Sequence, residues 1–276
     1  MKIAVHQMCS GTDIHVNAGK MADAIAQAAA NGAQFYFAPE MSGLLDRNRE
    51  RASSQIVEEN HNFLLATAID SAKKAGIWVH IGSIPVRTEE KNAKFANRSV
   101  LIDANGNIRA RYDKMHLFDV DLDAGETWRE SSAYIGGDDA VVAETPLGLM
   151  GMTVCYDLRF PELFARLSRS GAAIFAVPAA FTVPTGQAHW HILLRARAIE
   201  NAAFVVAAAQ SGTHQDGRKT FGHSLVVDPW GDVLLDMGQG EGLGYAELDL
   251  DRVDAVRRQI PVIANRRDIP PLVTRY

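Results

Sequence analysis

Apolar and polar residues alternate along this chain in blocks that predict strands and helices in turn. Short apolar runs at 3–7, 34–39 and 77–84 have the length of buried strands. Between them, an alanine-rich segment at 17–30 and a segment with one polar face at 54–75 are predicted to be helices. This order of elements is typical of an α/β protein, in which helices cover a sheet.

Three hairpins interrupt this alternation. The Asn105-Gly106 pair stands between strand patterns at 99–103 and 108–112, and Asn-Gly is a strong signal for a tight turn. Two further hairpins are predicted to join 140–145 to 149–154 and 224–227 to 233–235. Hairpins among strand–helix units favour mixed sheets, so a layered α/β sandwich is expected rather than a doubly wound parallel sheet.

Two apolar runs, 172–178 and 204–209, are nearly continuous rather than alternating. Strands that are buried on both faces have this pattern. Helices are therefore expected to cover the sheets, and the segments 160–170 and 188–201 are predicted to be two further helices.

The composition is that of one globular domain spanning residues 1–276. The chain is 47% hydrophobic, and neither a shift of composition nor a low-complexity linker marks a boundary. Apolar stretches are far shorter than the roughly 20 residues that span a bilayer, and the first residues resemble a strand rather than a secretory signal. Two cysteines make no disulfide framework, so a cytoplasmic location is expected. The net charge of −5 gives no reason to expect a nucleic-acid partner.

Three polar residues follow strand-like segments directly: Glu40, Lys114 and Cys155. Ligand sites in layered α/β proteins gather outside the carboxyl ends of strands, so these side chains are expected to converge. Each also has a structural interpretation, as a helix-start carboxylate, a surface charge and a packing thiol. Cys155 stands where a strand ends and a helix begins, and backbone N–H groups at such a point can stabilise a thiolate.

Together, these three residue types have the chemistry of acyl transfer. A carboxylate can take the proton of a thiol, the resulting thiolate can attack a carbonyl-like carbon, and an ammonium can stabilise the oxyanion that forms. A cysteine hydrolase can instead use histidine as its base, and the nine histidines of the chain leave that alternative open.

The segments around these residues resemble the three signatures of the nitrilase superfamily of carbon–nitrogen hydrolases, in the family's order. They are Phe-Ala-Pro-Glu-Met at 37–41, Tyr-Asp-Lys-Met-His-Leu-Phe at 112–118 and Val-Cys-Tyr-Asp-Leu-Arg-Phe-Pro-Glu at 154–162. The resemblance covers nearly the whole chain and includes 185–190, 195–201 and 222–231. It implies a four-layer α-β-β-α sandwich with two mixed β-sheets, and a homodimer or higher homo-oligomer.

The resemblance also implies a role for each site residue. Glu40 would be the general base, Lys114 the cation that stabilises the oxyanion, and Cys155 the nucleophile. A second glutamate, which orients the lysine and the substrate nitrogen, is matched by Glu130, with Glu126 as a less favoured occupant and a surface glutamate as the structural alternative. The backbone N–H of Tyr156 would be a further oxyanion donor.

Within the superfamily, the chain resembles the Nit branch, and especially the Nit1-type deaminated glutathione amidases rather than the ω-amidases. The segments 207–212 and 195–197 favour this choice, whereas His191 and the segment 266–270 depart from the usual pattern. Candidate substrate contacts are Arg159, Tyr156, Phe181 and Thr182. The guanidinium of Arg159 could bind a substrate carboxylate through two hydrogen bonds, or could form an ion pair with Asp157 or Glu162.

Neither a metal nor a cofactor is expected. His189 and His191 are two residues apart and point to different faces of a helix, and no zinc motif accompanies them. The glycine-rich segment 238–244 does not join a strand to a helix as a dinucleotide site requires, and is predicted to be a loop.

The expected activity is therefore cysteine-dependent hydrolysis of a small linear amide that carries a carboxylate, with release of ammonia through a thioester on Cys155. Hydrolysis by an ω-amidase or another aliphatic amidase, and nitrile hydrolysis, are the alternatives within the enzymes. A binding module without catalysis and a thiol redox sensor are the alternatives from other classes.

Overall fold

The computed structural model describes residues 1–88, 94–121 and 127–274. Its larger sheet has the strand order β18-β1-β2-β3-β5-β4, and β6 and β9 also pair with β5. The strands β1, β2 and β3 are parallel and the other pairs are antiparallel except for β5 with β9. The bounds are β1 (Lys2–Gln7), β2 (Phe35–Phe37), β3 (Trp78–His80), β4 (Ile84–Arg87), β5 (Phe95–Ile102), β6 (Ile108–Asp113), β9 (Tyr134–Ile135) and β18 (Gly242–Glu247).

The second sheet has the order β10-β11-β12-β13-β16-β17, with three parallel strands in its centre and antiparallel pairs at its edges. Its strands are β10 (Val142–Thr145), β11 (Gly148–Met152), β12 (Ile174–Ala176), β13 (Phe204–Ala207), β16 (Leu225–Val227) and β17 (Val233–Asp236). Two small antiparallel pairs complete the strands: β7 (Asp119–Asp121) with β8 (Thr127–Arg129), and β14 (Ser211–Thr213) with β15 (Lys219–Phe221).

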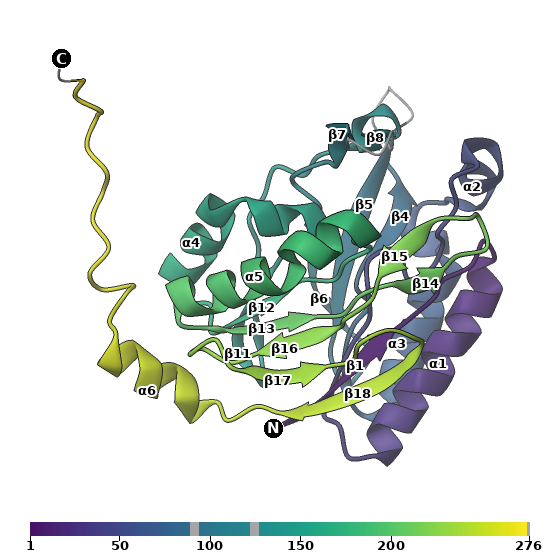
Figure 1. Cartoon of the computed structure of the whole chain (residues 1–276). Helices are drawn as coiled ribbons and strands as arrows, with labels where there is room; N and C mark the ends of the chain where they lie inside the picture. The colour runs from purple at the N-terminus through teal and green to yellow at the C-terminus, as the bar shows by residue number, and fades with distance from the viewer. Residues whose placement is uncertain (89–93, 122–126, 275–276) are drawn as a thin grey trace.

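Four layers result from the way successive strand residues face opposite sides. In β1, Ile3 and Val5 join a core shared with the second sheet, whereas Ala4 packs among residues of α1 (Ile14–Ala30) and α3 (Phe63–Ala75). The helices α4 (Pro161–Arg169) and α5 (Val183–Asn201) pack on the other sheet. Figure 1 shows the two helix pairs on opposite sides of the strands. The expected α-β-β-α sandwich with two mixed sheets is confirmed.

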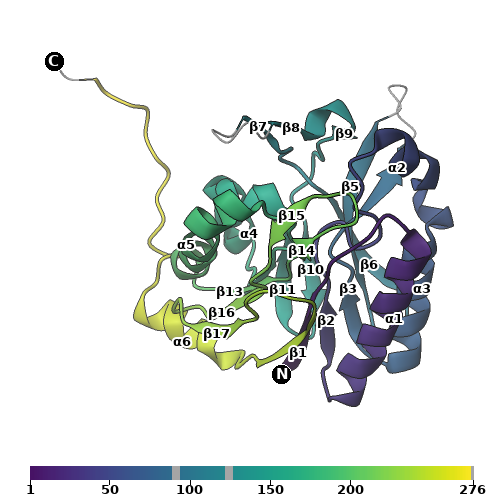
Figure 2. The same ribbon diagram turned by 45° about the vertical axis from the view of Figure 1, so that its right-hand side comes forward.

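Shorter elements gather at one end of the molecule. The helix α2 (Arg49–Gln55) lies at the same end as β7, β8 and β9 (Figure 2). The 3₁₀ helices are η1 (Glu59–His61), η2 (Glu130–Ser132) and η3 (Cys155–Arg159). After α6 (Asp251–Gln259), the chain runs away from the body of the protein in both views. No helix within the described ranges has the length and apolar content that crossing a bilayer requires.

Several sequence expectations needed correction. The helix predicted at 54–75 is three elements, because Ile56 is extended and the side chain of Asn62 accepts a hydrogen bond from the N–H of Leu65, which starts α3 afresh. The strand predicted at 77–84 is divided into β3 and β4. The glycine-rich loop expected at 238–244 ends inside β18. The elements β7, β8, β9, β14, β15 and α6 were not predicted, since most are too short to carry a periodic pattern.

Gly82 divides β3 from β4 and lies directly against the segment that leads to Glu40. Its φ is +72°, and a Cβ atom there would stand 1.9 Å from the carbonyl oxygen of Pro39 and 2.4 Å from that of Ala38. Only glycine fits this close approach of two backbones.

We expect Gly82→Ala to lower the free energy of unfolding by about 3 kcal/mol or more and to displace Glu40. Gly76→Ala is the matched control. Gly76 also has a positive φ, +67°, but a Cβ atom at this position would have no atom within 4 Å. That control should cost only about 1 kcal/mol. Equal losses for both variants in urea unfolding would show that the contact with Pro39 does not matter.

Candidate active site

Glu40, Lys114 and Cys155 converge where the two sheets' strands end. Glu40 lies three residues after β2, Lys114 directly follows β6, and Cys155 lies three residues after β11. The Nζ atom of Lys114 is 2.9 Å from Oε1 of Glu40, and the same carboxyl group is close enough to the Cys155 thiol to raise the pKa of that thiol. All three side chains are buried. The convergence expected from the strand ends is therefore observed.

Lys114 lies between two carboxylates rather than one. Glu130, the first residue of η2, places Oε2 at 2.8 Å and Oε1 at 3.1 Å from Nζ. The structure thus puts Glu130 in the second acidic position, whereas Glu126 lies outside the described residues. The backbone N–H of Phe118 donates to Glu130 at 2.6 Å and fixes the carboxylate in this position.

Asn97 is a site residue that sequence reasoning missed. Its Nδ2 donates to Glu40 at 2.9 Å and to Glu130 at 3.3 Å, so one amide joins both carboxylates that flank Lys114. Asn97 is fully buried in β5. A buried amide within a strand needs hydrogen-bond partners, and this was the only signal that the sequence offered.

Glu40 is also held by backbone and side-chain donors from the other sheet's side of the site. The N–H of Ala180 donates to its Oε2 at 2.9 Å, and Nε2 of Gln210 donates to its backbone carbonyl at 3.0 Å. One carboxylate oxygen is therefore directed at Lys114 and Asn97 while the other is bound by Ala180. These hydrogen bonds leave the Glu40 carboxyl group little rotational freedom.

Cys155 begins η3 in a left-handed conformation, with a φ of +48°. Its N–H donates to the carbonyl of Pro178 at 2.8 Å. The turn is anchored by the buried carboxylate of Asp157, which accepts hydrogen bonds from the N–H of Val154 at 2.8 Å and from the hydroxyl of Tyr112 at 2.7 Å. The strained turn directs the thiol toward the site. Tyr156 is the second residue of η3, so its N–H has no acceptor within that helix.

The charges of the site decide which groups carry protons. Burial alone would lower the pKa of Lys114, but Glu130 and Glu40 outweigh it and raise that pKa well above the ordinary value. Burial opposes ionisation of Glu40, yet the charge and hydrogen bond of Lys114 lower its pKa. Burial, followed by the charge of Glu40, raises the pKa of the Cys155 thiol well above its ordinary value. At neutral pH the site thus holds the ammonium of Lys114, the carboxylate of Glu40 and a neutral thiol, not the thiolate that a helix start can favour.

A cavity of about 970 Å³ opens onto these residues. Of the four candidate substrate contacts, Tyr156, Phe181 and Thr182 line it. Arg159 does not belong to its lining. The Arg159 guanidinium instead lies 3.3 Å from Nδ1 of His189 and 5.4 Å from the ring centroid of Phe181. Within the described ranges Arg159 forms no ion pair with Asp157 or Glu162. Neither the substrate-binding interpretation of Arg159 nor the ion-pair interpretation therefore matches its contacts.

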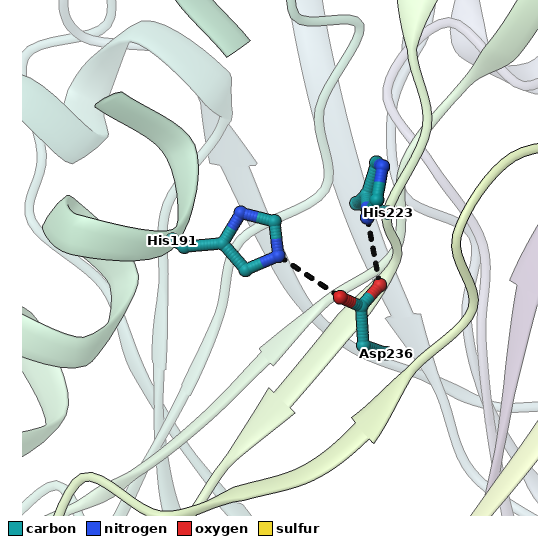
Figure 3. A group of neighbouring side chains, drawn as sticks. All are labelled: His191, His223 and Asp236. Atoms are coloured by element: carbon teal, nitrogen blue, oxygen red, sulfur yellow. Dashed lines mark hydrogen bonds and ion pairs between the residues drawn. The ribbon is translucent and has the colours of Figure 1, made fainter. Parts of the chain in front are cut away.

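One cluster outside the cavity has the composition of a metal site. His191 of α5, His223 and Asp236 of β17 place one ligand atom each within 4.8 Å of one another. Figure 3 shows both imidazoles directed at the carboxylate, with Nε2 of His191 at 3.0 Å and Nδ1 of His223 at 2.9 Å from its two oxygens. The second imidazole of this cluster is therefore His223 and not His189, which the sequence places two residues before His191. The carboxylate thus binds one nitrogen of each imidazole. The expectation of no metal stays a prediction.

The fold and the buried Glu–Lys–Cys arrangement define a class of enzymes that hydrolyse carbon–nitrogen bonds. Residues 2–258 match the family described as carbon–nitrogen hydrolase, and the chain belongs to that family. It is a hydrolase that acts on carbon–nitrogen bonds other than peptide bonds.

Individual relatives agree with this class. A deaminated glutathione amidase of Yersinia enterocolitica is 40% identical over 99% of this chain and 95% of its own length. The crystal structure of the C. elegans NitFhit protein superposes with a TM-score of 0.89 at 36% identity, over 96% of this chain and 65% of that one. An amidase from Nesterenkonia sp. AN1, crystallised with acrylamide added to its active-site cysteine, gives a TM-score of 0.78 at 27% identity over 95% and 98% of the two chains.

Proposed function

We propose that Cys155 is the nucleophile of this hydrolase, with Glu40 as its base and Lys114 as the oxyanion-stabilising cation. The observation that carries the proposal is the buried cluster in which Glu40 binds the ammonium of Lys114 and its charge raises the pKa of the Cys155 thiol. Because the thiol is neutral at rest, attack requires a base beside the sulfur, and Glu40 is the group that we assign to this role. The histidine alternative lacks comparable support, since no histidine lines the cavity in the described ranges.

The reaction then proceeds in two stages. Glu40 takes the thiol proton as sulfur bonds to the carbonyl carbon, and Lys114 with the Tyr156 N–H stabilises the oxyanion. Glu40 gives the proton to the departing nitrogen, the carbon–nitrogen bond breaks, and a thioester remains on Cys155. Water, deprotonated by Glu40, attacks the thioester and releases the carboxylic acid, and the proton returns to sulfur. Glu130 would orient Lys114 and the substrate nitrogen throughout.

The substrate that we propose is a small linear amide with a carboxylate, and deaminated glutathione is the leading example. Curated relatives named deaminated glutathione amidase support this choice at about 40% identity. In that compound the amide nitrogen belongs to a cysteinylglycine unit, so the leaving group would be an amine. A primary amide, such as an ω-amidase substrate, would release the expected ammonia instead. A cavity of about 970 Å³ has room for a ligand with substituents on both sides of the amide.

Product analysis over paired substrates tests this proposal. Deaminated glutathione, glutaramate and the nitrile that corresponds to glutaramate should be assayed separately for amine, ammonia and acid. We expect amide turnover to exceed nitrile turnover, with a covalent acyl adduct on Cys155 in intact-mass spectra. Turnover of the nitrile alone would favour nitrile hydrolysis. Oxidation of Cys155 by peroxide, without turnover of any amide, would favour a redox sensor.

The protonation states predict the pH dependence of the reaction. The reactive form needs ionised Glu40, whose pKa is lowered, and neutral Cys155, whose pKa is raised. Activity should therefore fall only as the pH drops below the ordinary glutamate value of 4.5, and should show no alkaline loss at the ordinary thiol value of 9.0. A profile of kcat/KM from pH 3 to 10 measures this. A transition between pH 6 and 8 would assign the proton transfer to another group.

The remaining expectations are proposals that rest on the family. We propose one carbon–nitrogen hydrolase domain, a cytoplasmic location, and a homodimer or higher homo-oligomer. Exposed apolar side chains support self-association, because large apolar groups on a surface mark interaction sites. Five of the eleven exposed large apolar side chains in the described ranges lie on α5 and in the segment that leaves the body after α6: Ile192, Ile199, Ile269, Leu272 and Val273. Sedimentation equilibrium gives the mass of the assembly directly.

A further inference from the structure

Two donors in the wall of the active-site cavity lack an acceptor. They are Nε of Arg218 and Nε1 of Trp128, which are inaccessible to solvent and make no hydrogen bond to any residue that the structure describes. Both residues line the cavity that holds Cys155. A buried donor without a partner costs about 1 to 3 kcal/mol, and more when the group is charged. Two such donors side by side indicate that something else binds them.

The two donors belong to one stack of side chains. The guanidinium carbon of Arg218 lies 4.6 Å from the ring centroid of Trp128, and that of Arg47 also lies 4.6 Å from it. Arg47 comes from the loop before α2, Trp128 from β8, and Arg218 from the turn between β14 and β15. Cation–π contacts hold both guanidinium planes against the indole. Three segments that are distant in sequence therefore place two positive charges on one aromatic ring.

No carboxylate among the described residues forms an ion pair with either guanidinium of the stack. The charge of Asp216 acts on Arg218, but the oxygens of Asp216 accept hydrogen bonds from the backbone N–H groups of Arg47, at 2.8 Å, and Arg218, at 2.9 Å. Asp216 thus joins the two loop backbones through hydrogen bonds and leaves both guanidinium groups available to bind a ligand. Asp46 is bound by Arg51 at 2.6 Å.

The other cations of the cavity are already paired or bound. Arg129 forms a two-point ion pair with Asp121, and Lys114 lies between Glu40 and Glu130. Lys94 donates to the carbonyl of Ser131 at 2.9 Å, and Arg49 donates to the hydroxyl of Ser132. Among the described cations of the cavity wall, Arg47 and Arg218 are therefore the two whose side chains donate no hydrogen bond to a protein acceptor.

We propose that the stack of Arg47, Trp128 and Arg218 is the subsite for a carboxylate of the substrate. The inference rests on the proposed function and names the residues that give it specificity. A carboxylate in the cavity would bind the guanidinium of Arg218, and a small movement of the stacked side chains would bring Nε–H of Arg218 and Nε1–H of Trp128 within its reach, while Arg47 would add its charge. Neutral amides would leave these donors unpaired, and such a site discriminates strongly against them.

Burial and charge at Arg218 agree with an anion as the missing partner. Burial lowers the pKa of the Arg218 guanidinium and the charge of Arg47 lowers it further, while Asp216 and Glu40 raise it. Arginine stays protonated despite this shift. Its buried positive charge has no ion-pair partner among the described residues. Arg159, the carboxylate partner considered from the sequence, lies outside the cavity lining and is the rival that the experiment must exclude.

Substrate pairs that differ in one group test the subsite. Glutaramate carries a carboxylate on the acyl side and pentanamide has a methyl group in its place. N-pentanoylglycine carries a carboxylate on the amine side and N-ethylpentanamide is its neutral counterpart. In the wild type, kcat/KM should favour the carboxylate member of at least one pair, and the pair that responds to Arg218→Gln identifies which side of the amide the subsite holds.

For that pair, Arg218→Gln should lower kcat/KM by about 100-fold for the carboxylate substrate, chiefly through KM, and by less than about threefold for the neutral one. Arg218→Lys keeps the charge without the planar guanidinium that can donate two parallel hydrogen bonds, and should lower kcat/KM for the carboxylate substrate about tenfold. Trp128→Phe keeps the ring without the N–H and should lose a similar factor. Arg258→Gln, at an exposed arginine of α6, is the matched control and should change neither substrate.

Binding separates this inference from the catalytic proposal. Titration calorimetry of glutarate or N-pentanoylglycine into Cys155→Ala protein needs no turnover, and the added Arg218→Gln substitution should weaken binding of one of them about 100-fold. Unchanged binding of both, or equal loss for charged and neutral substrates, would overturn the subsite while leaving amide hydrolysis intact. A selective loss in Arg159→Gln instead would move the subsite to Arg159. Failure of the wild type to cleave any amide would overturn only the catalytic proposal.

Discussion

Replacement of Cys155 by alanine is expected to lower amide turnover by at least about 10⁴-fold, because no hydroxyl among the described residues is hydrogen-bonded to the Glu40 carboxyl and could replace the thiol as nucleophile. The acyl adduct in intact-mass spectra should disappear with it. Cys155 has a φ of +48°, and alanine adopts this left-handed conformation at about the same cost as cysteine. A large change in folding is therefore not expected, and circular dichroism and thermal unfolding should stay close to the wild type.

Cys9 offers a matched control for this loss. It is the second free cysteine, partly exposed, with its sulfur 3.6 Å from the carbonyl of Thr213 and from Nδ1 of His214. Cys9→Ala should retain turnover within about twofold, since Cys9 does not line the cavity. Full activity of Cys155→Ala, or loss of activity in the Cys9 variant alone, would contradict the assignment of the nucleophile.

Lys114→Met should damage both catalysis and folding. The substitution removes the cation opposite the oxyanion, which we expect to cost at least about 10²-fold to 10³-fold in kcat. It also leaves Glu40 and Glu130 facing each other in a buried site without the ammonium that binds both at 2.9 and 2.8 Å. Breaking a buried ion pair from one side costs about 3 to 5 kcal/mol. Chemical denaturation measures the second effect independently of turnover.

The stability loss in this variant should depend on pH in a defined direction. Without Lys114, burial and mutual repulsion raise the pKa of at least one of the two carboxyl groups above its unfolded value. A group with a raised folded-state pKa contributes stability that is lost as the pH rises through that pKa. The difference from wild type should thus be larger at pH 8 than at pH 5. Lys74→Met, at an exposed lysine of α3, controls for the substitution, and a pH-independent difference would contradict the buried pair.

Much of the fold could be predicted from local pattern. The Asn105-Gly106 turn lies in the hairpin of β5 and β6, and the continuous apolar runs are the buried strands β12 and β13. Local pattern failed where a single residue changes the path of the chain. Gly82 divides a predicted strand, and Asn62 restarts a predicted helix. In both places the deciding factor is a contact with another part of the chain or a cap, not the average polarity of the segment.

The catalytic residues were accessible from sequence because each follows a strand and falls in a recognisable motif. Asn97 was not, since a lone amide in a strand has no motif, and its importance comes from lying between Glu40 and Glu130. Arg218 and Trp128 gave no signal either. Their joint role depends on a ring and a guanidinium that meet across 90 residues of chain.

The sequence by itself determined the α/β class, the three residues that follow strand ends, and the family to which the motifs belong. These depend on residue type and local spacing, which the chain carries directly. Only the tertiary structure decided the protonation of the site and the location of its spare positive charge. Cys155 holds its proton because burial and Glu40 act on it together. Nε of Arg218 has no acceptor within 1–88, 94–121 and 127–274, where Asp216 accepts from backbone N–H groups instead. Such effects depend on distances between segments, and folding alone sets those distances.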